Sequence, residues 1–245
     1  MPDGHHPPRA GRFSTTRWSL VVAAGATRSE HSAAALASLC EMYWYPVYVF
    51  IRRQGYPADD CADLTQAFFA RVLEKNYFAA VDRERGRFRA FLCASLRHFL
   101  ANERDRKRAL KRGGARPAIS LDAETAEGRY QLEPREGLTP EHLFDRRWAL
   151  LLLERVLGRL QTEQHQSGRS AQFAELREFL TGDGGSVPYA EVARRLDSTE
   201  GAIKVAVHRL RRRFRDLLVE EISETVDNPA DIDGEIAHLL KVVSA

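Results

Sequence analysis

Apolar residues recur at steps of three and four along most of the 245-residue chain, and no stretch alternates with a period of two. Steps of three and four place apolar side chains on one face of an α-helix, whereas alternation is typical of a half-buried strand. The pattern therefore predicts an all-α fold. The expected helices cover about 15–24, 32–53, 58–75, 87–111, 142–165, 171–181, 188–196, 199–219 and 230–243.

One long segment, KRGGARPAISLDAETAEGRYQLEPREGLTPE at 111–141, breaks this periodicity. It is rich in glycine, proline and acidic residues, which is typical of a linker. We therefore expect two small helical domains joined by a flexible connection. The expected parts are a leader with a short helix (1–31), a first domain (32–112), an acidic Gly/Pro-rich linker (113–141), a second domain (142–219) and an acidic C-terminal extension (220–245).

Several classes of protein are disfavoured by what the chain lacks. No apolar run approaches the roughly 20 residues that a membrane-spanning helix needs, and the N-terminus MPDGHHPPRAGRFSTTRW has no apolar centre typical of a secretory signal. The cysteines Cys40, Cys61 and Cys93 are widely spaced among apolar residues, which predicts buried, reduced thiols in a cytoplasmic protein. The pair His5–His6 is too small for a metal site, so we expect a disordered leader. No clustered metal-ligand spacing and no phosphate-binding glycine loop occurs, so we expect neither metal nor cofactor.

The net charge of +3 is modest, but the charges are unevenly distributed. Residues 83–116 contain twelve Lys/Arg and three acidic residues, and residues 204–215 contain six Lys/Arg and no acid. Each basic block is followed by an acidic stretch, 117–145 and 216–245. Two basic blocks indicate that a polyanion is held at two places.

The stretch YAEVARRLDSTEGAIKVAVHRLRRRF at 189–214 predicts two short helices around a tight turn. Asp197 stands at the turn, where it tolerates a left-handed conformation, and Thr199 is placed to cap the second helix. A recognition helix for the DNA major groove needs a polar outer face of this kind, although a solvated basic face without a partner has the same pattern. The packing side holds Val192, Ala193, Leu196, Ile203, Val207, Leu210 and Phe214, and the outer side holds Gly201, Lys204, Val205, His208, Arg209 and Arg212.

A second informative helix is CADLTQAFFARVLEK at 61–75. Leu64, Thr65, Phe68 and Val72 share one side of its helical projection. The opposite side carries a short acid, an amide and two small residues, which suits docking on another helix, although ordinary surface helices often look alike. These outward residues are Asp63, Gln66, Ala67 and Ala70.

A third stretch, GRFRAFLCASLRHFLANERDRKRALKRGG from residue 86, predicts a long helix with a basic reverse side. Arg97, Arg104 and Arg108 share that side with small alanines, which suits a nucleic-acid backbone laid across the helix. The preceding loop combines Tyr77 and Phe78 with arginines. These rings are able to hold an unstacked base, or alternatively close the domain core.

In this order the three motifs resemble those of bacterial RNA polymerase sigma factors of the extracytoplasmic-function type, and the whole sequence looks like a subgroup common in planctomycetes. DLTQAFFARVL is similar to the D-L-x-Q-x-x-F segment that docks on a coiled coil of the polymerase largest subunit. FRAFLCASLRHFLANERDR resembles the segment that opens and reads the minus-ten promoter element. YAEVARRLDSTEGAIKVAVHRLRRRFRDLL resembles the helix-turn-helix that reads the minus-thirty-five element. The implied sites are Asp63, Gln66, Phe69 and Ala70 for polymerase; Tyr77, Phe78, Arg87, Arg89, Arg97, Arg104 and Arg108 for minus-ten DNA; and Thr199, Lys204, Val205, His208, Arg209 and Arg212 for minus-thirty-five DNA.

The chain departs from this family at a few informative positions. Ala67 stands where relatives usually carry an acid, and His98 and Asn102 replace the usual Asn and Asp. Val205 and Ala206 replace a polar pair in the recognition helix, which predicts an unusual upstream element.

The resemblance implies a non-enzymatic initiation factor whose partners are core RNA polymerase, promoter DNA and an anti-sigma factor or other regulator. One alternative is an operator-binding helix-turn-helix regulator that works without polymerase. The other is an enzyme such as a nuclease, although Glu103 and Asp105 sit among arginines that they pair with more readily than with a metal.

The tail NPADIDGEIAHLLKVVSA at 228–245 predicts an amphipathic helix in an acidic setting. Two hypotheses follow for it. It folds over the basic recognition face and suppresses binding of free DNA, or it packs on its own domain or lies loose.

Overall fold

The computed structural model describes residues 30–74, 88–109, 121–133, 137–181, 187–223, 230 and 232–244. These residues form helices and no strand, which confirms the predicted all-α fold. The helix expected over 15–24 lies outside the described residues. The helices are α2 (Glu30–Arg53), α3 (Ala58–Glu74), α4 (Phe88–Ala109), α5 (Leu121–Tyr130), α6 (Pro140–Gln166), α7 (Ser170–Leu176), α8 (Glu178–Thr181), α9 (Tyr189–Arg195), α10 (Glu200–Ser223) and α11 (Ile232–Ser244).

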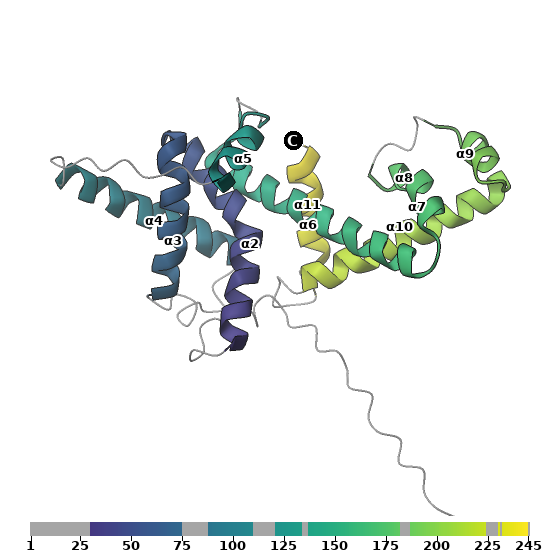
Figure 1. The fold of residues 1–245 in the computed structure, drawn as a ribbon, viewed down its shortest axis with the longest axis horizontal. Coiled ribbons are helices and arrows are strands. Elements are labelled where there is room, and N and C mark those ends of the chain that lie inside the picture. Colours follow the sequence, from purple (N-terminus) through teal and green to yellow (C-terminus); the bar gives the residue numbers. More distant parts are fainter. Residues whose placement is uncertain are drawn as a thin grey trace, which may run out of the picture.

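Helix α2 is the centre of the N-terminal half of the molecule, with α3, α5 and α6 around it (Figure 1). Five consecutive side chains, 47–51, are completely buried. A helix that is apolar on every side is expected only where other elements surround it. The ring of Phe68 on α3 meets Phe99 on α4 edge-on at 5.6 Å, which brings α4 onto the same core.

Helix α5 lies within residues 113–141, which the composition predicts to be a linker. Its Glu127 carboxylate accepts hydrogen bonds from the Tyr48 hydroxyl at 2.8 Å and from Arg52 at 3.0 and 3.1 Å. Burial alone would raise the pKa of Glu127, but these hydrogen bonds outweigh it and hold the pKa below its usual value. Because α5 is anchored mainly by polar contacts, it lacks the apolar stripe by which sequence patterns reveal a helix.

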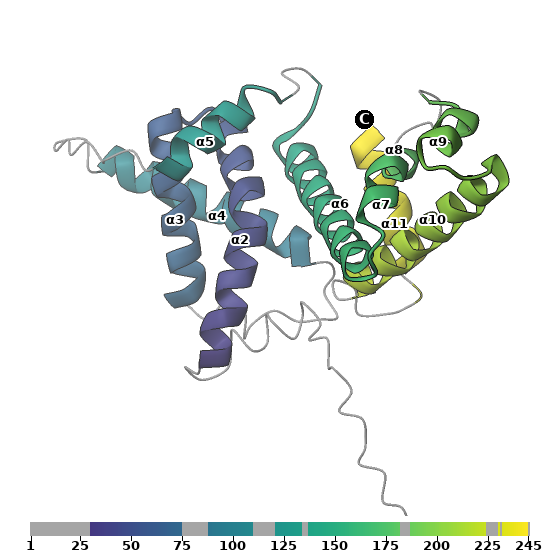
Figure 2. The ribbon, with the colours of Figure 1, turned by 45° about the vertical axis from the view of Figure 1, so that its right-hand side comes forward.

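Helix α6 joins the two halves of the molecule. At about 1.5 Å per residue its 27 residues span roughly 40 Å. Its first turn is fixed by Thr139, which accepts a hydrogen bond from the backbone N–H of His142, and by Pro140 at the first helical position. Helix α6 packs on α2, α10 and α11 (Figure 2). Arg159 and Glu163 in its C-terminal half pair with α10, whereas Asp145 near its start lies beside His238 of α11.

The contact between α2 and α6 makes one continuous core instead of two separate ones. Phe144 of α6 is buried, stacks on Tyr43 at 6.2 Å between ring centroids, and meets Phe50 edge-on at 6.5 Å. The expected boundary at residues 141 and 142 therefore does not coincide with a gap in the packing. In this arrangement the first helix of the expected second domain is also part of the first.

Two of the three cysteines are buried free thiols, as predicted, and the side chain of Cys40 lies outside the described residues. Burial raises the pKa of Cys61 and of Cys93 to about 12 in each case, so both remain protonated throughout the neutral range.

A thiolate is the reactive form of cysteine, so we expect Cys61 and Cys93 to react with a disulfide reagent at pH 7.5 on the order of 1,000-fold more slowly than a free thiol. Titration of the native protein with the disulfide reagent should show at most one rapidly reacting thiol, whereas the protein unfolded in guanidinium chloride should show three. Two or more rapid thiols in the native protein would contradict the burial.

Candidate nucleic-acid interface

Helices α9 and α10 are joined by the predicted tight turn. Asp197 adopts the expected left-handed conformation with φ of 47°. The Thr199 hydroxyl accepts a hydrogen bond from the backbone N–H of Ala202 at 3.2 Å, which caps α10 as predicted. The backbone N–H of Ser198 donates to the carbonyl of Ala193 at 2.9 Å and closes the turn. These local hydrogen bonds fix the direction in which α10 begins after the turn.

The two sides of α10 are divided as the sequence predicts. Ile203, Val207 and Leu210 are buried with Val192 and Ala193 of α9. The outer side is exposed along its length, and Val205 is a large apolar residue that remains 50% exposed. The exposed outer residues are Gly201, Lys204, Val205, His208, Arg209 and Arg212.

The cationic side chains on this outer side differ in whether an acidic side chain already pairs with them. Lys204 forms an ion pair with Glu200 at 2.6 Å, which raises its pKa, and lies 5.8 Å from the Tyr189 ring. Arg209 and Arg212 make no ion pair with the part of the chain that the structure describes. These two guanidinium groups are therefore the most accessible cations for a phosphate or a base edge.

Half of the basic block at 204–215 serves the fold, which the sequence count did not reveal. Arg211 donates to the backbone carbonyl of Phe179 at 3.0 Å. Arg213 pairs with Glu163 of α6 at 2.7 Å, and Arg215 lies 3.6 Å from Asp233 of α11. Arg211 and Arg215 stay exposed, so they have a partner within the fold and still contribute to the basic surface of α10.

The predicted docking side of α3 is exposed. Asp63, Gln66 and Ala70 are all exposed, together with Ala67. Phe69 is different, because it is buried in the core and its ring lies 5.6 Å from that of Phe68. Phe69 therefore supports this side of α3 from below and does not form part of its surface.

Helix α4 carries two exposed arginines with partners on other elements. Arg97 lies 3.6 Å from Glu141 at the start of α6, and its side chain stays 57% exposed. Arg104 donates to the Tyr56 hydroxyl at 3.0 Å, with its guanidinium 5.2 Å from that ring. The predicted contacts Tyr77, Phe78 and Arg87, and the side chain of Arg108, lie outside the described residues.

Arg89 corrects one prediction. The sequence places it with the arginines that face minus-ten DNA, but in this structure it is only 5% exposed. Its guanidinium forms ion pairs with Asp145 of α6, at 3.2 Å, and with Glu235 of α11, and lies 3.7 Å from the centroid of the Trp148 ring. Arg89 is therefore inaccessible to DNA in this arrangement of the chain.

A family model described as ECF sigma factor matches residues 53–220, more than half of the chain. The chain belongs to the ECF sigma factor family. The resemblance drawn from the three motifs is thereby confirmed, and with it a role of a DNA-binding sigma factor in transcription initiation. Searches of the curated proteins and of the solved structures found no significant match to this chain.

The matched region places the two faces described above, on α3 and on α10, in one sigma factor. Within the described residues, no helix is long and apolar enough to cross a membrane. The same residues contain no group of three or more His, Cys, Asp or Glu side chains that would hold a metal ion.

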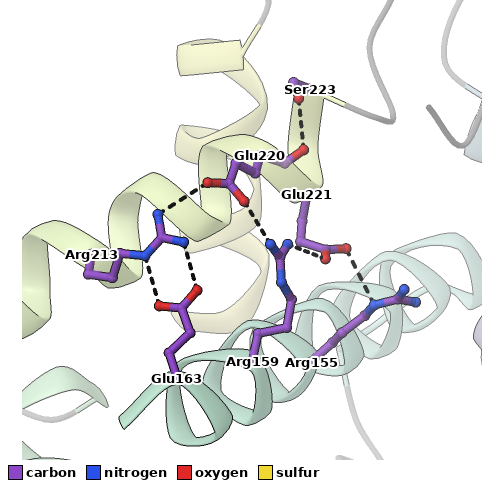
Figure 3. Close-up of polar contacts among 7 residues, drawn as sticks. All are labelled: Arg155, Arg159, Glu163, Arg213, Glu220, Glu221 and Ser223. Carbon is purple, nitrogen blue, oxygen red and sulfur yellow. Dashed lines mark hydrogen bonds and ion pairs between the residues drawn. The ribbon is translucent and has the colours of Figure 1, made fainter. Parts of the chain in front are cut away.

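Helix α10 of this sigma factor is held on α6 by a network of ion pairs (Figure 3). Arg213 donates two hydrogen bonds to Glu163, at 2.9 and 2.7 Å, and these hold the pKa of Glu163 below its usual value. Arg159 of α6 reaches Glu220 at 2.7 Å and Glu221 at 2.8 Å. Glu221 is buried, so its charge depends on these partners. Sequence patterns did not indicate this network, because its members are far apart in the chain.

Replacing Arg159 with Met is expected to lower the free energy of unfolding by about 2 kcal/mol, because the buried carboxylate of Glu221 loses its closest cation. Urea denaturation measures the change. Arg155→Met is the matched control, since Arg155 is on the same helix but lies 3.5 Å from Glu221 and is half exposed. The Arg155→Met variant should lose less than about 1 kcal/mol of unfolding free energy. An equal loss of unfolding free energy in the two variants would contradict the importance of Arg159.

The C-terminal helix of the sigma factor does not cover the outer side of α10. Lys204, His208, Arg209 and Arg212 remain exposed with α11 in place, so the hypothesis that the tail masks this face is wrong for the described residues. Helix α11 packs on α6 and α10 instead, as the alternative hypothesis expected.

Proposed function

We propose that this ECF sigma factor binds core RNA polymerase, directs it to promoters and assists promoter melting. The exposed side of α3 formed by Asp63, Gln66 and Ala70 would dock on the polymerase. A short acid, an amide and a small residue let another helix approach closely while supplying polar partners. The observation that carries the proposal is that this exposed side and the exposed cations of α10 occur in one chain of this family.

Helix α10 would fix the position of the polymerase on the minus-thirty-five element. Its N-terminal residues would enter the major groove, with Lys204 and Arg212 near phosphates and Arg209 near a base edge. The half-exposed methyl groups of Val205 are suited to the C5-methyl of a thymine. Thr199, at the start of the helix, and His208 would complete the contact.

Helix α4 and the loop before it would hold the melted strand of the minus-ten element. Arg97 and Arg104 supply exposed cations on α4. Tyr77, Phe78, Arg87 and Arg108 are proposed for the same role on the basis of the family resemblance. An anti-sigma factor or other regulator is a further proposed partner.

The proposal is tested by run-off transcription with core RNA polymerase and genomic DNA, followed by mapping of the start sites. We expect transcripts that depend on the added factor and begin downstream of a shared pair of sequence elements. Absence of factor-dependent transcripts, with no binding of the factor to core polymerase, would overturn the proposal.

An operator-binding regulator remains the competing function, since the α9–α10 pair alone fits either. Such a regulator would bind duplex DNA tightly without polymerase. Gel-shift titration of the factor on the mapped promoter, with and without core polymerase, separates the two. Equal affinity in both titrations would favour the regulator.

A further inference from the structure

The C-terminal helix α11 ends the chain between α6 and α10 and reaches the start of α4 (Figures 1 and 2). Its inner side buries Leu239 and Glu235, with Ile236 and Val243 packed against the core. Burial of Leu239 needs no explanation beyond its apolar surface. Burial of Glu235, which is only 1% exposed, requires a specific partner.

That partner is Arg89 of α4, and the pair is enclosed by a third element, α6. The side chains of Arg89 and Glu235 are 6% and 2% exposed. Asp145 of α6 accepts from Arg89 at 3.2 Å, and the Trp148 ring covers the guanidinium at 3.7 Å. His238 of α11 lies 3.4 Å from the same Asp145. A charge buried to this degree is tolerated only when it is paired, so α11 and α4 hold one another in place.

Two arginines on the basic side of α4 are paired with carboxylates in this structure. Arg89 is bound by two carboxylates, and Arg97 lies beside a third, that of Glu141. Carboxylates and phosphates bind a guanidinium by the same charged hydrogen bonds. While α4, α6 and α11 are together, acidic side chains of the chain itself therefore occupy positions that phosphates would take. The docking side of α3 remains exposed in the same arrangement.

We propose that α11 is an internal clasp that holds the start of α4 against α6 and withholds Arg89 from single-stranded DNA in the free factor. The biological role of the clasp rests on the proposed function. The physical prediction is separate: opening the clasp should raise the affinity of the free factor for single-stranded DNA and leave its affinity for core polymerase unchanged.

The test uses the full chain with Glu235→Gln, which keeps the shape of the side chain and removes the charge that faces Arg89. The probe is a fluorescein-labelled 20-nucleotide single-stranded DNA of mixed sequence. We expect the free variant to bind it about tenfold more tightly than the wild type, and its radius of gyration in small-angle X-ray scattering to increase. Affinity for core polymerase should stay within twofold.

Glu175→Gln is the matched control, because it removes the same charge from a surface ion pair with Arg195, at 3.3 Å, that does not involve α4 or α11. It should bind the probe as the wild type does. The double variant Arg89→Met with Glu235→Leu replaces the ion pair by an apolar pair, and should restore the compact form. If Glu235→Gln folds poorly, the chain ending at Ser223 is measured instead.

The outcomes separate the clasp from the proposed function. Unchanged DNA affinity in Glu235→Gln, or an equal gain in Glu175→Gln, would overturn the clasp even if the factor binds polymerase and starts transcription. A selective gain in DNA affinity, in a factor that does not bind core polymerase, would support the clasp and contradict the proposed function.

Discussion

Replacing Asp63 and Gln66 together with alanine is expected to lower the affinity of the factor for core RNA polymerase by at least tenfold. Both side chains lie on the exposed side of α3, so truncation leaves the packing of the helix intact. The few side chains that dominate an interface cost about 2 kcal/mol or more each when truncated. The double variant removes two polar groups from the proposed centre of the contact, so we expect a loss of at least that size. Factor-dependent transcription should fall in parallel.

Fluorescence anisotropy of labelled factor titrated with core polymerase measures this loss. The control Glu154→Ala with Gln161→Ala removes the same two chemical groups from exposed positions on α6. It should leave the affinity unchanged. Circular dichroism establishes that both variants fold. Wild-type affinity in the Asp63 and Gln66 variant would refute the docking role of α3 and would remove the main argument against an independent regulator.

The features that the sequence predicts well are those decided by residues close together in the chain. The left-handed Asp197 and the cap at Thr199 depend on a few neighbouring positions, and both are found. The same holds for the exposed sides of α3 and α10, because the period of a helix relates each residue to those three and four positions away. These local rules determine most helices and which of their sides face solvent.

Features that depend on distant residues were not predictable in this way. Arg89 looks like the other arginines of α4, and nothing near it shows that Glu235 will bury it. The basic block on α10 is divided for the same reason, since the partner of Arg213 lies on α6. Charged side chains follow no periodic rule that identifies a partner on another helix.

The predicted separation into two domains stays a prediction, but the segment between them holds more structure than its composition indicated. The composition of residues 113–141 suggested a flexible segment, but Glu127 of α5 is hydrogen-bonded to Arg52 of α2. Phe144 of α6 stacks on Tyr43 of α2, so the apolar core continues from α2 to α6. Composition reports the average character of a segment, whereas a few well-placed contacts decide whether it packs. The buried ion pair of Arg89 adds a third tie across the same boundary.

Replacing Arg209 and Arg212 with alanine is expected to weaken binding to the minus-thirty-five element by about 30-fold or more, since an arginine that contacts a base edge contributes about 1–3 kcal/mol and two are removed. These two side chains are chosen because both are exposed and neither is held by an ion pair among the described residues. Lys204 is a weaker choice, since Glu200 already neutralises part of its charge at 2.6 Å.

Footprinting of holoenzyme on the mapped promoter measures the protection of the upstream element, and titrations at several salt concentrations measure the charge involved. Each lost phosphate contact should lower the slope of log affinity against log salt by about one. The control Arg177→Ala with Lys241→Ala removes two positive charges from exposed positions outside α10, and should alter neither protection nor slope. If both double variants lose affinity equally, total charge and not the outer side of α10 determines binding. Selective loss of upstream protection in the Arg209 and Arg212 variant would instead locate promoter recognition on α10, where Val205 and Ala206 differ from the usual polar pair.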